Sequence, residues 1–241
     1  MAIEGIAGFR NFIIRALPES SREVLASSLE PIALPRGQYL YRTGERIEDL
    51  YFIEEGMVSL VRSTKEGHYV EVGTVGPEGI APPTAVFDVD HAVLDSMIQM
   101  PVRALRIDRK HLAERLAADR ALSRIVRGYV AVALSQLTQT AACNILHHIE
   151  QRCSRWLLTA HDSALADRFV LTHEFLAMML GVRRASVSTA AETLQRAGYI
   201  RYSRGNVAIT DRHGLERFTC ECYGAVRDQF KALFGRSIQA R

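Results

Sequence analysis

Long apolar runs and cysteine-rich motifs are both missing from this 241-residue sequence. No stretch reaches the roughly 20 consecutive apolar residues that a membrane-spanning helix needs. The first residues lack a basic start followed by a long apolar run, so we expect no secretory signal and a cytoplasmic location. Hydrophobic residues make up 48% of the chain, which is enough for packed cores and excludes a disordered chain.

Cysteine is scarce, and its spacing is unlike that of common metal sites. The four cysteines all lie in the second half, at Cys143, Cys153, Cys220 and Cys222. The C-x-C of Cys220 and Cys222 places its thiols on opposite faces of a strand or far apart around a helix. The adjacent His147 and His148 likewise point to different sides of a helix, which is poor geometry for one metal ion. We therefore interpret the cysteines as reduced packing residues and predict no metal site.

Catalytic signatures are also missing. The sequence contains no Walker-type phosphate loop, no G-x-S-x-G and no H-E-x-x-H. We predict that the chain is not an enzyme.

Positive charge is concentrated at the C-terminal end. Residues 143–241 contain 14 Lys and Arg against 9 Asp and Glu, whereas residues 1–142 contain 16 against 18. A basic C-terminal part joined to a faintly acidic one is typical of a protein that binds nucleic acid at one end.

The first half alternates between helical and strand patterns. Residues 1–30 have helical spacing of apolar residues. Between residues 35 and 107, short runs rich in β-branched and aromatic residues are separated by glycines at turn positions. This pattern predicts many short antiparallel strands that form a sandwich or barrel.

A long amphipathic helix is predicted after the strands, following a shorter helix for which Asp108 is the expected N-cap. Its apolar stripe consists of Leu122, Val126, Tyr129, Val130, Ala133 and Leu137. Such a seam can pack against its own domain or against a second copy of the chain. The C-terminal pattern described next favours a dimer. A further helix is expected over residues 142–159.

The last third contains the spacing of a helix-turn-helix. Thr172 is a candidate N-cap for a short helix, Ala177 is a small residue where a second helix can approach, and Gly181 stands at the turn. The second helix begins near Arg184, with Val187, Ala191 and Leu194 on its inner face. After Gly198, the segment IRYSRGNVAIT predicts two strands around a Gly-Asn turn, which would form a wing.

Small and basic residues gather where the second helix would enter the major groove. Short hydroxyl and arginine side chains there can reach base edges or phosphates, and the helix N-terminus attracts a phosphate. The predicted DNA-binding residues are Thr172, Arg183, Arg184, Ala185, Ser186, Ser188, Thr189, Arg201 and Arg204.

Nearly the whole chain resembles the Crp/Fnr family of transcriptional regulators. The resemblance is carried by LPRGQYLYRTGERIEDLYFIEEGMVSLVRS, which resembles a cyclic-nucleotide-binding β-roll, and by LTHEFLAMMLGVRRASVSTAAETLQRAGYIRYSRG, which resembles the family's winged helix. It implies an α+β fold with an N-terminal antiparallel β-roll domain (1–119), a dimerisation helix (120–142) and a C-terminal winged helix-turn-helix domain (143–241). It also implies a homodimer on a palindromic operator in double-stranded DNA, with RNA polymerase as a further partner.

The sequence departs from the nucleotide-binding members of that family. These members hold the cyclic phosphate with a Gly-Glu pair and an Arg-Ser or Arg-Thr pair, and the matching positions here are Pro82-Pro83 and Val93-Leu94. Proline has no N–H to donate, and Val93 and Leu94 carry no charge. Because a buried phosphate without partners is very costly, we predict no cyclic AMP or cyclic GMP binding in the family mode.

Three modes of control remain open at this stage. An apolar pocket around Val86, Phe87, Val93 and Leu94 could accept a small hydrophobic effector. Haem could bind His68 or His91, but a lone histidine beside a turn more often faces solvent. Alternatively, the β-roll is degenerate and the regulator is controlled by a protein partner or by its abundance. The first 142 residues contain no cysteine, so no N-terminal iron–sulfur centre is expected.

Overall fold

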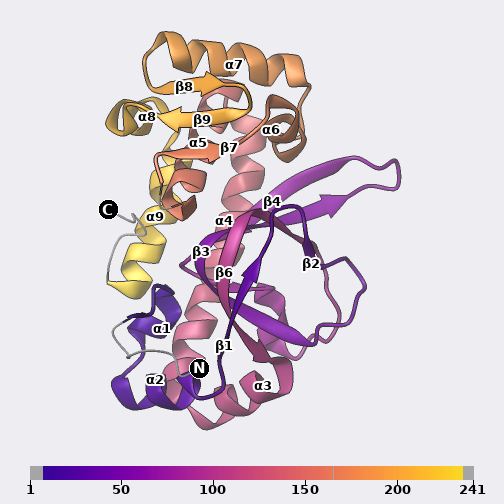
Figure 1. Cartoon of the computed structure of the whole chain (residues 1–241), viewed down its shortest axis with the longest axis vertical. Coiled ribbons are helices and arrows are strands. Elements are labelled where there is room, and N and C mark those ends of the chain that lie inside the picture. Colours follow the sequence, from indigo (N-terminus) through magenta and orange to yellow (C-terminus); the bar gives the residue numbers. More distant parts are fainter. Residues whose placement is uncertain (1–7, 165, 236–241) are drawn as a thin grey trace.

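The computed structural model describes residues 8–164 and 166–235. An antiparallel roll forms the N-terminal half, one long helix runs through the middle, and helices with a small sheet form the other end (Figure 1). The α+β class predicted from the sequence is therefore confirmed. In the described residues, no helix is both long and apolar enough to cross a membrane.

The N-terminal roll is an antiparallel sheet of six strands. Its strands are β1 (Glu30–Leu34), β2 (Tyr39–Tyr41), β3 (Asp49–Ser63), β4 (Tyr69–Val75), β5 (Ile80–Ala81) and β6 (Asp95–Asp108). The order is β1-β6-β3-β4, with β2 on β6 and β5 on β3. At Gly56, φ is +88° and a Cβ atom would lie 2.1 Å from the Pro101 carbonyl oxygen, so only glycine fits where β3 crosses β6.

Short helices close the ends of the roll. They are α1 (Phe12–Ala16), α2 (Glu19–Ala26), the 3-10 helix η2 (Pro83–Phe87) and α3 (Arg109–Ala118). The Asp108 carboxylate accepts hydrogen bonds from the N–H groups of Lys110 and His111, so it caps α3 as predicted. Residues 1–7 of the predicted N-terminal helical stretch lie outside the described residues.

The long helix α4 (Arg120–Leu146) continues past its predicted end. The sequence from Ala142 to Leu146 has neither proline nor glycine, so nothing stops the helix there. The break comes at His147, whose φ of −112° and ψ of 148° are extended, and α5 (Ile149–Ala164) follows. The prediction of a new helix from residue 142 was wrong by several residues.

The predicted dimer seam of α4 faces its own chain. Leu122, Val126, Tyr129 and Ala133 are between 0% and 6% exposed, and they belong to the core of the roll. Val130 is half-buried against that core, and Leu137 lies against Gly73 of β4. The assignment of Leu122, Val126, Tyr129 and Ala133 to a dimer interface is corrected, because a side chain already buried within one chain has no surface left for a partner. Val130 and Leu137 keep some exposed surface, so their assignment stays a prediction.

The C-terminal half is a winged-helix arrangement with an additional helix. It contains β7 (Arg168–Val170), α6 (His173–Leu180), α7 (Arg184–Arg196), β8 (Ile200–Ser203), β9 (Asn206–Ile209), α8 (Arg212–Phe218) and α9 (Glu221–Phe234). The small sheet has the order β7-β9-β8. Helix α9 returns along α4 towards α1, where the rings of Phe12 and Phe234 are 5.9 Å apart (Figure 1).

Two apolar cores stabilise the molecule. The first fills the roll and includes Phe230 and Phe234 of α9. The second lies under the C-terminal helices and includes Met57 and Met97 from the roll. Both halves therefore contribute to both cores, which fixes the C-terminal part against the roll.

Candidate nucleic-acid interface

Two helices joined by a tight turn form the centre of the candidate interface. The Thr172 hydroxyl accepts a hydrogen bond from the Phe175 N–H at 3.1 Å and so caps α6, as predicted. Gly181 ends that helix with φ of +63°, in the left-handed region that glycine adopts without steric cost. Helix α7 then begins at Arg184, the residue predicted from the sequence.

The inner face of α7 packs as its spacing predicts. Val187, Ala191 and Leu194 are between 0% and 4% exposed, and Ala177 of α6 is also buried. Small residues where two helices cross allow their backbones to approach closely. This packing fixes the direction in which the opposite face of α7 points.

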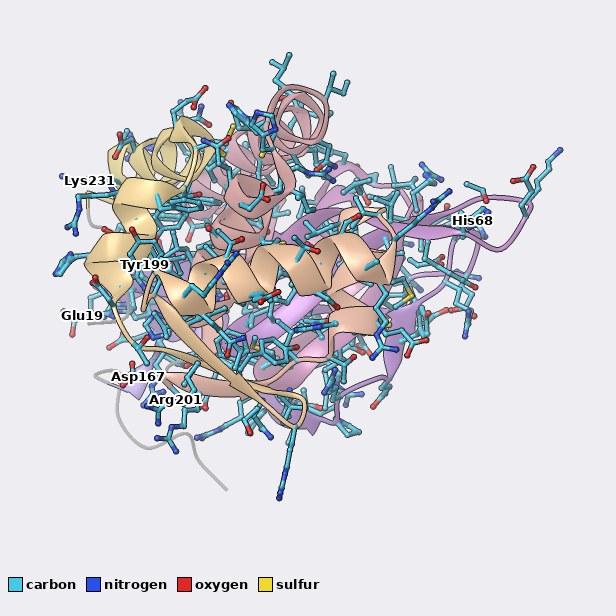
Figure 2. The ribbon with its side chains drawn as sticks, turned by 90° about the horizontal axis from the view of Figure 1, so that it is seen from above. Glu19, His68, Asp167, Tyr199, Arg201 and Lys231 are labelled. Atoms are coloured by element: carbon cyan, nitrogen blue, oxygen red, sulfur yellow. The ribbon has the colours of Figure 1, made fainter. Side chains whose placement is uncertain are left out.

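The outer face of the α7 N-terminus is open to solvent. Arg183, Arg184, Ala185 and Thr189 follow one another along it, with Arg184 and Ala185 exposed and Ser186 and Ser188 at its edges. The exposed Thr189 hydroxyl donates to the Ala185 carbonyl at 3.2 Å, so its oxygen can still accept a hydrogen bond. Helix α7 lies at the end of the molecule farthest from α2 and α3 (Figure 1), and Figure 2 views that end from above.

The wing forms where it was predicted, but its turn is shifted by one residue. Ser203 pairs with Asn206, so the two turn residues are Arg204 and Gly205 and not Gly205 and Asn206. Both have positive φ, +47° and +78°, as the tight two-residue turns of hairpins require. The shift places the exposed Arg204 at the tip of the wing. The exposed Arg201 lies on β8, and Figure 2 shows it on the side of Asp167.

A histidine and a tyrosine that the sequence analysis did not single out hold this surface together. Nδ1 of His173 lies 2.9 Å from the Ser188 hydroxyl, and its ring centroid lies 4.3 Å from that of Tyr202. The Tyr202 hydroxyl donates to the Leu171 carbonyl. His173 thus joins α6 to α7 and to the wing. In the sequence, this role of His173 is indicated only by its position directly after the N-cap Thr172.

Electrostatics at the start of α7 favour an anion. Burial lowers the pKa of His173, and the nearby positive charge of Arg184 lowers it further. The imidazole is therefore neutral at pH 7, and the charge of Arg184 remains available for a ligand. The surface hollow between α7 and the wing is lined by Thr172, His173, Glu174, Arg184, Tyr202, Arg204 and Gly205.

The predicted effector residues divide between core and surface. Val86 and Leu94 pack against the core of the roll, whereas Phe87 is 55% and Val93 is 41% exposed. An apolar effector site at these residues stays a prediction. The two histidines considered for haem are exposed: His68 lies near Glu66 at the far tip of the roll (Figure 2), and His91 pairs with Asp90 at 2.9 Å.

Family comparisons match both halves of the chain. The family model of the cyclic nucleotide-binding domain matches residues 31–119. The family model of the Crp-like helix-turn-helix domain matches residues 151–218. A "CRP-like cAMP-activated global transcriptional regulator" of Mycobacterium tuberculosis is 26% identical over 212 residues. That similarity covers 85% of this chain and 95% of the relative.

Solved structures share the fold. FixK2 from Bradyrhizobium japonicum superimposes with a TM-score of 0.66 at 15% identity, covering 80% of this chain and 98% of that one. A transcriptional regulator of the CRP family from Thermus thermophilus gives a TM-score of 0.63 at 22% identity, covering 87% and 100%.

Proposed function

Because the chain belongs to the Crp/Fnr family of transcriptional regulators, we propose that it binds a palindromic operator in double-stranded DNA as a homodimer. One observation carries the proposal. The N-terminus of α7 exposes Arg184 and Ala185 at the end of the molecule, while the opposite face of the helix is buried in the core. A helix presented in this way can enter a major groove without rearrangement.

Some residues of this surface suit contacts with base edges, and others suit contacts with the phosphate backbone. Arg184 has the planar donor pair that matches O6 and N7 of guanine, and the Ala185 methyl group can contact a thymine methyl. The free N–H groups at the start of α7 suit a phosphate. We assign Arg201 on β8 and Arg204 at the wing tip to contacts with the adjacent DNA backbone.

A different face of α4 from the one first predicted supports the dimer. Its exposed side includes Ala131, Leu134, Thr138, Ala141 and Ile145. These positions advance by alternating steps of three and four, the spacing of a coiled-coil seam. Leu134 is 61% and Ile145 is 83% exposed, and burying such side chains against a second α4 would stabilise a dimer.

We propose that control does not involve a cyclic nucleotide bound in the family mode. Pro82 and Pro83 open helix η2 and provide no N–H donors, and Val93 and Leu94 stand where a cation would be needed. RNA polymerase is the second partner that we propose for a regulator of this class.

Selection from random duplexes tests the function directly. The full chain, immobilised and incubated with a random-sequence duplex library at physiological salt, should enrich a two-fold symmetric site with half-sites about one helical turn apart. The enriched site should bind at least about 1,000-fold more tightly than a scrambled duplex. Enrichment of no sequence, or of an asymmetric one, would contradict the proposal.

A further inference from the structure

Three of the four cysteines converge on one histidine at the junction of α4, α5 and α9. The ligand atoms of Cys143, His147, Cys220 and Cys222 all lie within 4.8 Å of one another. Cys143 and Cys220 Sγ are 3.6 Å apart, and Cys222 Sγ is 3.5 Å from Nδ1 of His147. From these four side chains we propose that the protein binds one zinc ion, which fastens α9 to the end of α4.

Two of the six separations among the ligand atoms match those around a single tetrahedral ion. Zinc bound by sulfur at about 2.3 Å and by nitrogen at about 2.0 Å separates two sulfurs by about 3.8 Å and a sulfur and a nitrogen by about 3.5 Å. The two measured separations are within a few tenths of an ångström of these values. Three thiolates and one imidazole leave no open position, which is typical of a structural zinc site.

Local backbone geometry explains why the sequence spacing hid this site. Cys220 is not inside a helix but is the N-cap of α9, with extended φ of −75° and ψ of 164°. Its thiol therefore points to the same place as that of Cys222, which lies in the first turn of α9. Cys143 and His147 are four residues apart on one face of α4, and His147 caps the end of that helix. The expectation that the C-x-C thiols would point apart was wrong for this reason.

The surroundings suit a metal centre. His147 Nε2 lies 3.2 Å from a carboxylate oxygen of Glu221, so the carboxylate can orient the ring with Nδ1 towards the ion. Gln139 donates its Nε2–H to Cys222 Sγ at 3.0 Å. Arg155 lines the same cavity as Cys222, and its buried Nε has no hydrogen-bond partner in the part of the chain that the structure describes. A cation there offsets the surplus negative charge of three thiolates around Zn²⁺.

The three cysteines also differ from an ordinary packing cysteine. Cys143, Cys220 and Cys222 form a buried group separate from both apolar cores, whereas Cys153 lies inside the second core. All four proposed ligands lie outside the segments 31–119 and 151–218 that match the family domains. The site is therefore a property of this chain's own junction, and it does not depend on the proposed DNA binding.

Metal analysis of the full-length protein tests the site. We expect about one zinc per chain after purification under reducing conditions, and the same content in Cys153→Ala, the matched control. Cys143→Ser and Cys222→Ser should lose most of the metal. Co²⁺ exchanged into the wild-type protein should give the thiolate charge-transfer band and the strong visible bands of a tetrahedral ion.

A milder variant keeps the test decisive if the serine variants fail to fold. His147→Ala removes the one proposed ligand that is partly exposed, at 16%, and keeps the three buried cysteines. The variant should still fold. A competing chelator should remove its zinc at a concentration at least about tenfold lower than the wild-type protein requires, and its cobalt bands should differ from those of wild type. Wild-type protein that takes up neither zinc nor cobalt would overturn the proposal. So would metal retained unchanged in these variants, a Cys143–Cys220 disulfide, or bound iron with sulfide.

Discussion

The indole Nε1–H of Trp156 on α5 donates a hydrogen bond to Oε1 of Glu71 on β4, at 2.8 Å. The Glu71 carboxylate also accepts from the Ser59 hydroxyl, and it is only 7% exposed. This contact joins the roll to the DNA-binding half across 85 residues of sequence. Burial raises the pKa of Glu71 to about 7, although both hydrogen bonds and the charge of Arg155 oppose the rise.

This raised pKa predicts a stability that depends on pH. Because the folded pKa of Glu71 is above its ordinary value of 4.5, its protonated form is favoured by folding. The protonated Glu71 contributes fully to the free energy of unfolding below about pH 4.5, and this contribution is lost as the pH rises through 7. Glu71→Gln keeps a donor and an acceptor without the charge. The variant should be more stable than wild type above pH 7, by roughly 2–3 kcal/mol.

Denaturant unfolding between pH 5 and pH 8.5 measures this effect. Glu66→Gln is the matched control, because the Glu66 side chain is 84% exposed in the loop between β3 and β4. The free energy of unfolding of this control should change with pH in the same way as that of wild type. If that of Glu71→Gln also does so, Glu71 titrates at its ordinary pKa and the contact with Trp156 is ionic at neutral pH.

Arg184→Ala should relax operator specificity. If Arg184 reads a guanine, the change costs about 1–3 kcal/mol on the selected operator and much less on a duplex altered at that base pair. Competition binding with single-base-pair variants of the operator measures this difference. Arg196→Ala removes the same charge at the other end of α7 and should leave the base preference intact. An equal loss on every duplex would make Arg184 a phosphate contact.

Arg204→Ala should weaken binding to all sequences alike. A lost phosphate contact lowers the slope of log affinity against log salt by about 1. Titrations at several salt concentrations measure that slope. Arg15→Ala is the control, because Arg15 is exposed on α1, away from the end of the molecule that carries α7 (Figure 1). An unchanged slope for the Arg204 variant would exclude the wing tip from the contact.

Leu134→Glu should separate the proposed dimer. The substitution places two like charges at the seam of paired α4 helices, and the dimer should weaken at least about 100-fold, or about 3 kcal/mol. Sedimentation velocity with and without operator DNA checks this. Val24→Glu changes an exposed apolar residue of α2 in the same way and should remain dimeric. A Leu134→Glu protein that still dimerises would place the seam elsewhere.

Calorimetry with cyclic AMP and cyclic GMP should show no saturable binding at micromolar concentration. The reason is the lack of N–H donors at Pro82 and Pro83 and of a positively charged side chain at Val93 and Leu94. A titration with a clear isotherm would show that other groups of the roll hold the phosphate.

Local signals predicted much of the candidate interface. The Thr172 cap follows from a side chain that bonds to its own backbone, and the turn at Gly181 follows from the freedom of glycine at positive φ. Helix α7 begins at Arg184, directly after that turn. The wing was predicted too, but its turn was shifted by one residue. Strand pairing between Ser203 and Asn206 decides that register, and no local signal encodes it.

The amino-acid sequence by itself therefore determined where α3, α6 and α7 begin, which of their faces are apolar, and that a helix-turn-helix lies in the last third of the chain. Only the tertiary structure decided what covers each apolar face: the stripe with Val126 packs on its own roll, and the side with Leu134 stays exposed. It also decided that Cys143 and Cys220, 77 residues apart, come together. Periodicity reports that a face must be buried, but the burying surface is supplied by segments far away in the chain.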